Sequence, residues 1–257
     1  MKSIKLRKGM NVGLFLFLII LTGCNSGYSV KNIAGGRVPM TEVFDNHTAD
    51  KEVMDIIEKY KKGLDSIMSP VVGHAAQNLD SYRPESPMSN LMADLLRRSA
   101  VKAIGKESDI AVMNIGGIRN SFTKGEITYG NIFEIAPFEN AFCVLVMDGA
   151  AVQELFEQIA YVRGEGLSGA ELVISKDRKL ISASIGGKPV DPNKEYTVAT
   201  IDYLAEGNDK MTAFLKAKSK VLPKNALLRD LLFEYVSDCE KKGVLIDAKV
   251  EGRITVR

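Results

Sequence analysis

From residue 50 to the C-terminus, short apolar runs alternate with stretches of helical periodicity. Residues 110–113 are an apolar run typical of a buried strand, whereas residues 88–104 place Leu91 and Leu95 on one face and Arg97 and Arg98 on another, as an amphipathic helix does. We find no internal repeat. Short strands and helices mixed in this way predict an α+β (mixed α/β) fold, with one mixed sheet covered by helices.

The other elements expected from the pattern follow the same alternation. Helices are predicted over residues 50–68, 88–104, 150–161 and 227–241, and strands over 110–113, 125–129, 141–147, 172–174, 183–185, 196–201 and 254–256. Residues 71–87 are expected to be irregular, because Pro84 and Pro87 exclude a regular helix there.

The first 23 residues predict export. Four positive charges precede an apolar run at 12–21, which is too short to span a bilayer and is typical of a signal peptide. The end of this segment, Leu21-Thr22-Gly23-Cys24, resembles a bacterial lipobox and predicts lipidation of Cys24. We therefore expect a membrane-anchored lipoprotein, periplasmic or at the cell surface, with the outer membrane as the expected location. An uncleaved membrane anchor is the alternative.

Removal of residues 1–23 changes the formal net charge from +2 to −2, so charge does not favour nucleic acid as a partner. Residues 24–49, rich in Gly, Ser, Asn and Thr, predict a flexible tether to a single domain over 50–257. Cys143 and Cys239 lie in strand-like and helix-like segments and are expected to be buried or half-buried thiols. A disulfide between them is permitted by the compartment but is not indicated.

The segment Asn114-Ile-Gly-Gly-Ile-Arg119 follows a predicted strand. Gly116 and Gly117 remove side-chain bulk and permit positive φ, so a ligand can approach the backbone. The guanidinium of Arg119 offers a planar fork of donors that suits a phosphate or a carboxylate. A turn followed by a surface arginine is the alternative.

Five blocks in order now support a resemblance: Asn114 to Arg119, Gly125-Glu-Ile-Thr128, Pro137-Phe-Glu-Asn140, Asp148-Gly149 and Asp202-Tyr-Leu-Ala-Glu-Gly-Asn-Asp209. Together they resemble the C-terminal, substrate-binding domain of the 5′-nucleotidase family, over nearly the whole of residues 50–257. The resemblance implies that domain's fold and a nucleoside or nucleoside monophosphate as the bound molecule.

The resemblance also implies a role for individual residues. Asn114 and Arg119 would meet the phosphate, beside Gly116 and Gly117. Phe138 and Tyr203 would stack on the base, which needs only flat apolar faces. Asn140 offers an amide edge to the base, and Asp209 can accept from ribose hydroxyls. The glycines around residues 167–169 resemble the family's loop beside the base.

Each role has a plain structural alternative. Phe138 suits the core, and Tyr203 suits packing with its hydroxyl in water. Asp209 beside Gly207 is ordinary turn chemistry, as is Asn140 at a strand start. Arg119 suits a surface ion pair with Glu126 or Glu139.

Two departures from the family are visible. The family's metallophosphoesterase domain holds two metal ions with His, Asp and Asn ligands, but this chain has only His47 and His74 and no run resembling its motifs. We therefore expect no cofactor in this chain and divalent metals in a separate partner. The second departure is that Tyr82 occupies the family's arginine position before Glu85, with Arg83 one place out of register.

The sequence thus favours the substrate-binding half of a split 5′-nucleotidase, inactive alone and working with a separately encoded metallophosphoesterase. One alternative is a non-catalytic lipoprotein that captures nucleosides or nucleotides. Another is a surface interaction protein that kept the fold and lost the ligand. No catalytic or metal-binding residue is predicted.

Overall fold

The structure, a computed structural model, describes residues 30–33, 35–36 and 51–257. The predicted signal peptide and Cys24 lie outside the described residues, as does most of the predicted tether. The helices are α3 (Lys51–Met68), α4 (Pro87–Ile104), α5 (Tyr129–Ile135), α6 (Gly149–Tyr161), α7 (Asp202–Ala205) and α8 (Leu228–Lys241), with 3₁₀ turns η1 (Ile115–Gly117) and η2 (Thr212–Lys216). The strands are β1 (Val71–Ala75), β2 (Ile110–Met113), β3 (Gly125–Thr128), β4 (Phe142–Asp148), β5 (Gly166–Ser168), β6 (Ala170–Ile174), β7 (Leu180–Ile185), β8 (Lys188–Pro189), β9 (Glu195–Ile201), β10 (Ser219–Val221) and β11 (Ile254–Val256).

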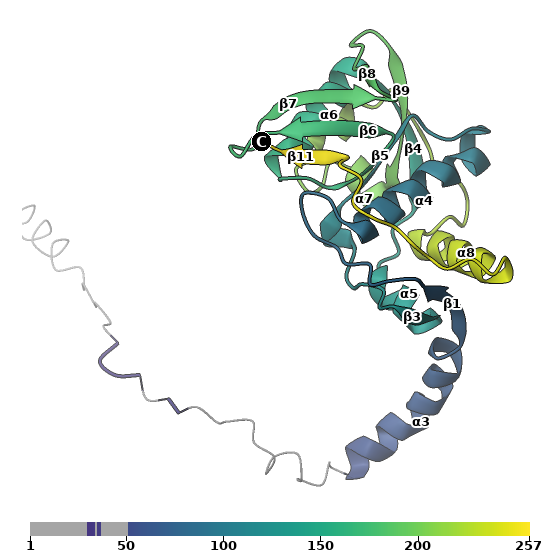
Figure 1. The fold of residues 1–257 in the computed structure, drawn as a ribbon. Coiled ribbons are helices and arrows are strands. Elements are labelled where there is room, and N and C mark those ends of the chain that lie inside the picture. Colours follow the sequence, from purple (N-terminus) through teal and green to yellow (C-terminus); the bar gives the residue numbers. More distant parts are fainter. Residues whose placement is uncertain (1–29, 34, 37–50) are drawn as a thin grey trace, which may run out of the picture. The chain divides into compact units, whose positions relative to one another are not determined.

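The central sheet has the strand order β10-β4-β9-β2-β5. Within it β2 runs parallel to β9, and β9 runs antiparallel to β4 with Phe142 opposite Ile201. All four residues of β2 are buried, because α4 and the neighbouring strands β5 and β9 pack against them. Figure 1 shows α4 beside β5. A mixed sheet of this kind places the end of β2, the end of β9 and the start of β4 at one edge.

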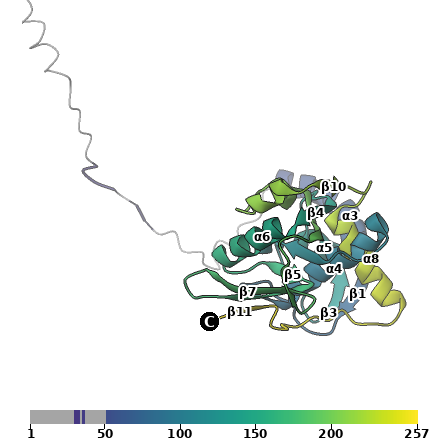
Figure 2. The same cartoon turned by 90° about the horizontal axis from the view of Figure 1, so that it is seen from above.

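A second sheet, β11-β6-β7-β8, pairs the C-terminal strand in parallel with β6. Figure 2 shows β7 and β11 on one side of the molecule and β10 on the opposite side. The chain passes from the central sheet to the second sheet at Gly169, whose φ is +79°. A Cβ at Gly169 would lie 2.2 Å from the carbonyl oxygen of Asp109, so only glycine fits this turn.

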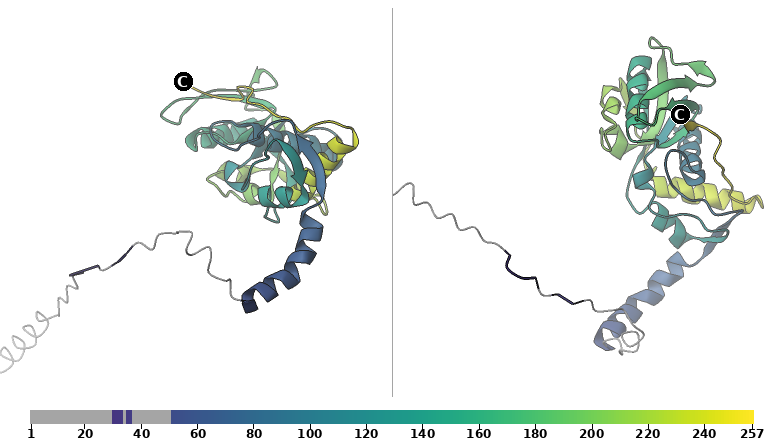
Figure 3. Two further views of the ribbon diagram at one scale, coloured as in Figure 1. Left: turned by 60° about the horizontal axis from the view of Figure 1, so that its bottom comes forward. Right: turned by 60° about the vertical axis from the view of Figure 1, so that its left-hand side comes forward.

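A third, two-stranded sheet pairs β1 with β3 in antiparallel register. It lies beside α5, where α3 joins the rest of the structure (Figures 1 and 3). The amide of Tyr129, the first residue of α5, donates to the carbonyl of Pro70 at 3.1 Å. Gly73 on β1 allows close packing, since a Cβ there would lie 2.5 Å from Cγ1 of Val236 on α8.

The start of α4 is fixed by a buried carboxylate. Ser86 caps the helix by accepting from the amide of Ser89, and Pro87 occupies its first turn. The buried side chain of Glu85 accepts from Asn90 Nδ2 at 2.7 Å, from the amide of Glu251 at 2.7 Å and from the amide of Ile254 at 3.2 Å. Glu85 therefore ties the C-terminal segment to the beginning of α4.

The α+β fold class is confirmed, and so is every predicted helix, each with a shift of one residue at its start. The prediction of one sheet is wrong, because the described residues form three. Gly169 turns the chain from the central sheet into the second, and β1 pairs with β3 in the third. The prediction of irregular backbone over 71–87 is also wrong at its start, where β1 forms. His74 lies on this strand, with Nδ1 2.9 Å from Glu240 Oε2.

Cys143 is buried on β4 and Cys239 is half-buried on α8, and both are free thiols, as predicted. Burial raises the pKa of Cys143 to about 12. Within residues 30–33, 35–36 and 51–257, no helix combines the length and apolar character needed to cross a membrane.

Candidate functional site

A cavity of about 330 Å³ opens at the sheet edge where β2, β9 and β4 meet. Three segments far apart in sequence line it: Asn114, Gly116 and Gly117 after β2, Phe138 and Asn140 before β4, and Tyr203 and Asp209 after β9. The strand directions explain the meeting, because parallel β2 and β9 end at the same edge and antiparallel β4 begins there. Seven of the eight residues singled out from the sequence thus share one cavity.

The loop after β2 is a single 3₁₀ turn, and neither of its glycines has a positive φ. Gly117 is needed for space instead, since a Cβ there would lie 2.6 Å from Oδ1 of Asn114. At Gly116 the nearest atoms to a Cβ would be 3.9 Å away. The expectation of positive φ at these glycines is therefore wrong. A close approach to the backbone is found at Gly117, where the side chain of Asn114 takes the space.

Asn114 and Asp209 join two of the three segments. Nδ2 of Asn114 donates to Oδ2 of Asp209 at 2.7 Å, and the hydroxyl of Tyr203 donates to Oδ1 of the same carboxylate at 3.0 Å. This hydrogen bond raises the pKa of the Tyr203 phenol above its ordinary value of 10.0. Oδ1 of Asn114 is buried and has no hydrogen-bond partner among the described residues.

Asp202 joins the segment before β4 to the segment after β9. Its Oδ1 accepts from the amide of Ala141 at 3.0 Å and from the amide of Tyr203 at 2.8 Å. The carbonyl of Asn140 accepts from the amide of Leu228, at the start of α8. The backbone on either side of the cavity is therefore fixed by hydrogen bonds.

Phe138 and Tyr203 present flat, accessible faces to the cavity. Phe138 is 48% exposed and Tyr203 is 39% exposed. The alternative of Phe138 as a core residue is therefore wrong, and Tyr203 has its hydroxyl bonded to Asp209. Two exposed aromatic rings beside amide and carboxylate groups suit a molecule with a flat ring and several hydroxyls.

Arg119 does not line this cavity, but it lies next to it. Its amide donates to the carbonyl of Ile135 at 3.0 Å, and its Nη1 donates to the carbonyl of Gly116 at 3.2 Å. The structure shows no ion pair of Arg119 with Glu126 or Glu139 among the described residues. The guanidinium thus leaves most of its donors available beside the Gly116 backbone.

Glu165 is a buried residue behind the loop that the sequence did not single out. Its Oε2 accepts from the amide of Ile115 at 2.5 Å, and its Oε1 accepts from the Arg83 guanidinium. Burial raises the pKa of Glu165 above its ordinary value, although the Ile115 amide and Arg83 oppose the shift. A glutamate between two glycines, Gly164 and Gly166, was the signal available in the sequence.

Arg83 therefore supports the loop from behind: besides Glu165, its Nε donates to the carbonyl of Gly164 at 2.8 Å. Tyr82, at the family's arginine position, is exposed. The segment 167–169, expected beside the base, is instead mostly strand β5, paired with β2 and outside the lining of the cavity.

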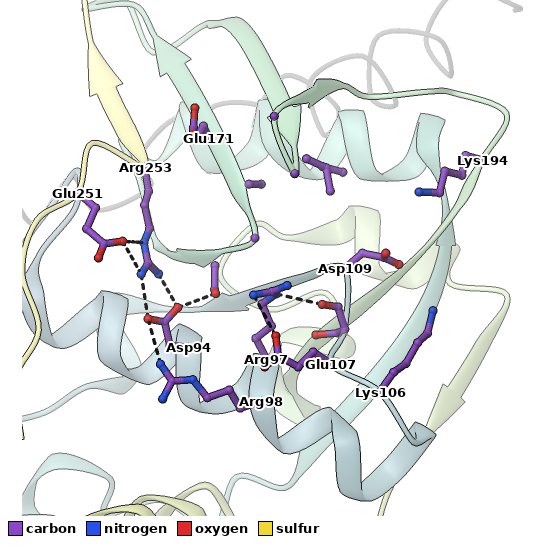
Figure 4. A pocket seen from close by; sticks show the side chains of 17 residues that line it. Asp94, Arg97, Arg98, Lys106, Glu107, Asp109, Glu171, Lys194, Glu251 and Arg253 are labelled. Carbon is purple, nitrogen blue, oxygen red and sulfur yellow. Dashed lines mark hydrogen bonds and ion pairs between the residues drawn. The ribbon is translucent and has the colours of Figure 1, made fainter. Parts of the chain in front are cut away.

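A larger, polar cavity of about 870 Å³ lies between α4 and the second sheet, and none of the predicted site residues lines it (Figure 4). Some of its charges pair with one another. Arg253 makes two hydrogen bonds to Asp94, at 2.7 and 2.9 Å, and Ser168 donates to Asp94 at 2.6 Å. These partners hold the pKa of Asp94 below its ordinary value, against the effect of burial.

The described residues contain no group of three or more His, Cys, Asp or Glu side chains placed to hold a metal ion. The cavity between Asn114 and Asp209 offers stacking surfaces, amides and one carboxylate. It can bind and orient a small molecule, and Arg119 adds a cation beside it.

Comparison with known proteins shows which family this chain resembles. The sequence model of a family described as 5′-nucleotidase, C-terminal domain, matches residues 71–216. The trifunctional nucleotide phosphoesterase protein YfkN of Bacillus subtilis is 28% identical over 232 residues, covering 82% of this chain and 15% of that protein. Protein UshA of Escherichia coli is 35% identical over 106 residues, covering 40% of this chain and 19% of that protein.

Among solved structures, the 5′-nucleotidase precursor of Thermus thermophilus has a TM-score of 0.71 and 24% sequence identity, covering 80% of this chain and 43% of that one. This likeness supports the fold. The chain thus spans less than half the length of each of these relatives.

Proposed function

Since the chain belongs to the 5′-nucleotidase family through its C-terminal domain, we propose that it is the nucleotide-binding half of a split 5′-nucleotidase. The observation that carries the proposal is the convergence of Asn114, Phe138, Asn140, Tyr203 and Asp209 on one cavity. Phe138 and Tyr203 take the base between their rings, Asp209 accepts from ribose hydroxyls, and Arg119 and Asn114 meet the phosphate.

Hydrolysis then requires groups from elsewhere. An attack on phosphorus in this family needs two metal ions and an activated water, and the donor set around the cavity does not fit a two-metal centre. We assign the metals to a separately encoded metallophosphoesterase, and we assign binding and orientation of the substrate to this chain.

The test is reconstitution. The pure protein is expected to release no phosphate from adenosine monophosphate with Mg²⁺, Mn²⁺ or Zn²⁺, and release is expected once a metallophosphoesterase encoded beside it is added. Arg119→Ala is expected to weaken the reconstituted reaction by about 10- to 100-fold, the effect of losing a charge-assisted contact. Ile181→Ala, at an exposed position on β7, is the control. Turnover by the pure protein alone contradicts the proposal.

One observation favours a second candidate, the capture of nucleosides or nucleotides without chemistry. Arg83 is bound to Glu165 and Tyr82 stands at the usual arginine position, so the phosphate would rest largely on Arg119. Calorimetric titration separates the candidates. Equal affinity for adenosine and its monophosphate favours capture, whereas an increment from the phosphate that disappears in Arg119→Ala favours the nucleotidase. If neither the wild type nor Phe138→Ala binds adenosine or its monophosphate, the remaining hypothesis is a surface interaction protein that has lost the ligand.

We also propose that Cys24 carries the lipid anchor and that the domain is exposed to the periplasm or the cell surface. The sequence of residues 21–24 supports this proposal. Metabolic labelling with palmitate is expected to mark the wild type but not Cys24→Ala, which is expected to move from the membrane to the soluble fraction. Protease treatment of intact cells distinguishes the two faces of the outer membrane.

A further inference from the structure

Helix α3 exposes an apolar face that nothing in the described structure covers. None of its 18 residues is buried. The exposed apolar side chains are Val53, Met54, Ile56, Ile57, Tyr60, Leu64 and Ile67. Scattered apolar residues on a surface are ordinary, but a continuous stripe of this kind marks a contact site.

The spacing places these side chains on one side of the helix. Positions 53, 57, 60, 64 and 67 repeat at intervals of four and three residues, and Met54 and Ile56 widen the stripe. In proteins, most of the stability of a helix comes from packing of its apolar face rather than from helix propensity. Burial of this face is therefore expected to stabilise α3.

A second copy of the chain suits this face poorly. The repeat covers little more than two heptads, whereas a coiled coil recognisable from sequence needs about three to four. Met54 and Ile56 make the stripe wider than the narrow seam of a two-stranded coil. A stripe of this width instead suits the surface of a globular partner.

A lipid surface suits it no better. Helices that lie on membranes carry an excess of Lys and Arg on the polar face. The charged residues of α3 are Lys51, Glu52, Asp55, Glu58, Lys59, Lys61, Lys62 and Asp65, in which the two signs balance. Attraction to anionic lipid is therefore absent from its charge pattern.

The end of α3 lies close to the candidate nucleotide cavity. A Cβ at Gly130 would lie 3.1 Å from the carbonyl oxygen of Met68, so the last residue of α3 packs against the first turn of α5. Helix α5 has seven residues, about 10 Å at 1.5 Å per residue. Its last residue, Ile135, accepts from the amide of Arg119, and Phe138 follows three residues later.

We propose that the apolar face of α3 is the docking surface for the metallophosphoesterase, and this inference rests on the proposed function. A globular partner that contacts the C-terminal end of α3 stands about one short helix away from Arg119 and Phe138. That position suits a protein whose metal ions must reach a phosphate held beside Arg119. The partner is expected to present an apolar groove lined by few charges.

The test uses the mature chain with Ile57→Glu and Leu64→Glu combined. The matched control is Ser66→Glu, which adds a negative charge on the polar side of the same helix. The double variant is expected to bind the metallophosphoesterase at least tenfold more weakly, by sedimentation or surface binding, and to lose reconstituted phosphate release to the same extent. Its affinity for adenosine is expected to be unchanged, which shows that the domain is folded. Ser66→Glu is expected to behave as wild type.

Several results overturn the docking surface. The first is that the wild type does not bind the metallophosphoesterase, or binds it no more tightly than the double variant does. The second is that the wild type forms a dimer and the double variant does not. The third is that the unlipidated wild type floats with anionic vesicles and the double variant does not. The proposed function fails separately. If the pair forms through α3 but releases no phosphate, the docking surface stands and the nucleotidase proposal falls. If the double variant supports full phosphate release, the nucleotidase proposal stands and the docking surface falls.

Discussion

The hydroxyl of Tyr203 donates to the carboxylate of Asp209 at 3.0 Å, across a turn in which Asp209 has a φ of +52°. The bond orients both the ring and the carboxylate toward the cavity that they share with Asn114. Stacking and hydroxyl recognition are therefore coupled at this point of the site.

The first prediction concerns this bond. Tyr203→Phe keeps the ring and removes the hydroxyl, so binding of adenosine is expected to weaken by about 2- to 12-fold, the equivalent of about 0.5–1.5 kcal/mol for one hydrogen bond. Tyr203→Ala, which also removes the ring, is expected to weaken it further. Calorimetry measures both, with Tyr161→Phe as the control outside the cavity. Equal affinities of Tyr203→Phe and wild type would show that the hydroxyl does not order the site.

A second prediction separates the two glycines after β2. In Gly117→Ala the new methyl group meets Oδ1 of Asn114, so a loss of about 1–3 kcal/mol in the free energy of unfolding is expected, together with weaker nucleotide binding. Gly116→Ala has open space around the methyl group and is expected to unfold at nearly the wild-type urea concentration. Equal stability of the two variants would contradict the described geometry.

A third prediction concerns the support behind the loop. Glu165→Gln keeps an acceptor for the Ile115 amide but loses the charge that binds Arg83. We expect each of Glu165→Gln and Arg83→Gln to reduce stability and phosphate-dependent affinity. In a double-mutant cycle measured by urea unfolding, the two changes are expected to be coupled by at least about 0.5 kcal/mol. Additive effects would mean that Arg83 and Glu165 act independently.

A fourth prediction gives a pH dependence to the polar cavity of Figure 4. Arg253 and Ser168 hold the pKa of Asp94 below its ordinary 3.8, so the paired carboxylate contributes stability that is complete above pH 3.8. This contribution is lost as pH falls through the lowered folded-state pKa. Asp94→Asn is expected to cost about 1.5–3 kcal/mol at pH 7, and the difference from wild type should shrink below pH 3.8.

The control for this prediction is Glu107→Gln. Glu107 pairs with Arg97 at 3.1 Å, but both side chains are more than one-third exposed, and the pair is expected to contribute less than about 1 kcal/mol. A pH-independent cost of Asp94→Asn would show that the carboxylate acts through shape rather than charge.

The sequence predicted the four long helices and most strands because their periodicity is local, whereas the short helices α5 and α7 were not predicted. It also singled out Phe138, Tyr203 and Asp209, although local sequence patterns do not tell which strands lie next to one another. Their meeting depends on the parallel pairing of β2 with β9, which joins residues about 90 positions apart. The resemblance to a family supplied that information before the structure did.

What the sequence missed depends on long-range contacts. Strand β1 has only five residues, and its Gly73 is explained by Val236, far along the chain on α8. Arg83 looked like a displaced phosphate ligand, but its partner Glu165 lies 82 residues away. Neither partnership leaves a periodic pattern, so neither could be predicted from local sequence.

The three hydrogen bonds accepted by Glu85 limit where this chain can be truncated. The match to the family model ends at residue 216, yet Glu85 inside that stretch accepts hydrogen bonds from the amides of Glu251 and Ile254. Cutting the chain at 216 would strand a buried carboxylate and remove the helix and strand that cover its surroundings. The smallest piece of this chain expected to fold therefore extends beyond the stretch that the family model matches.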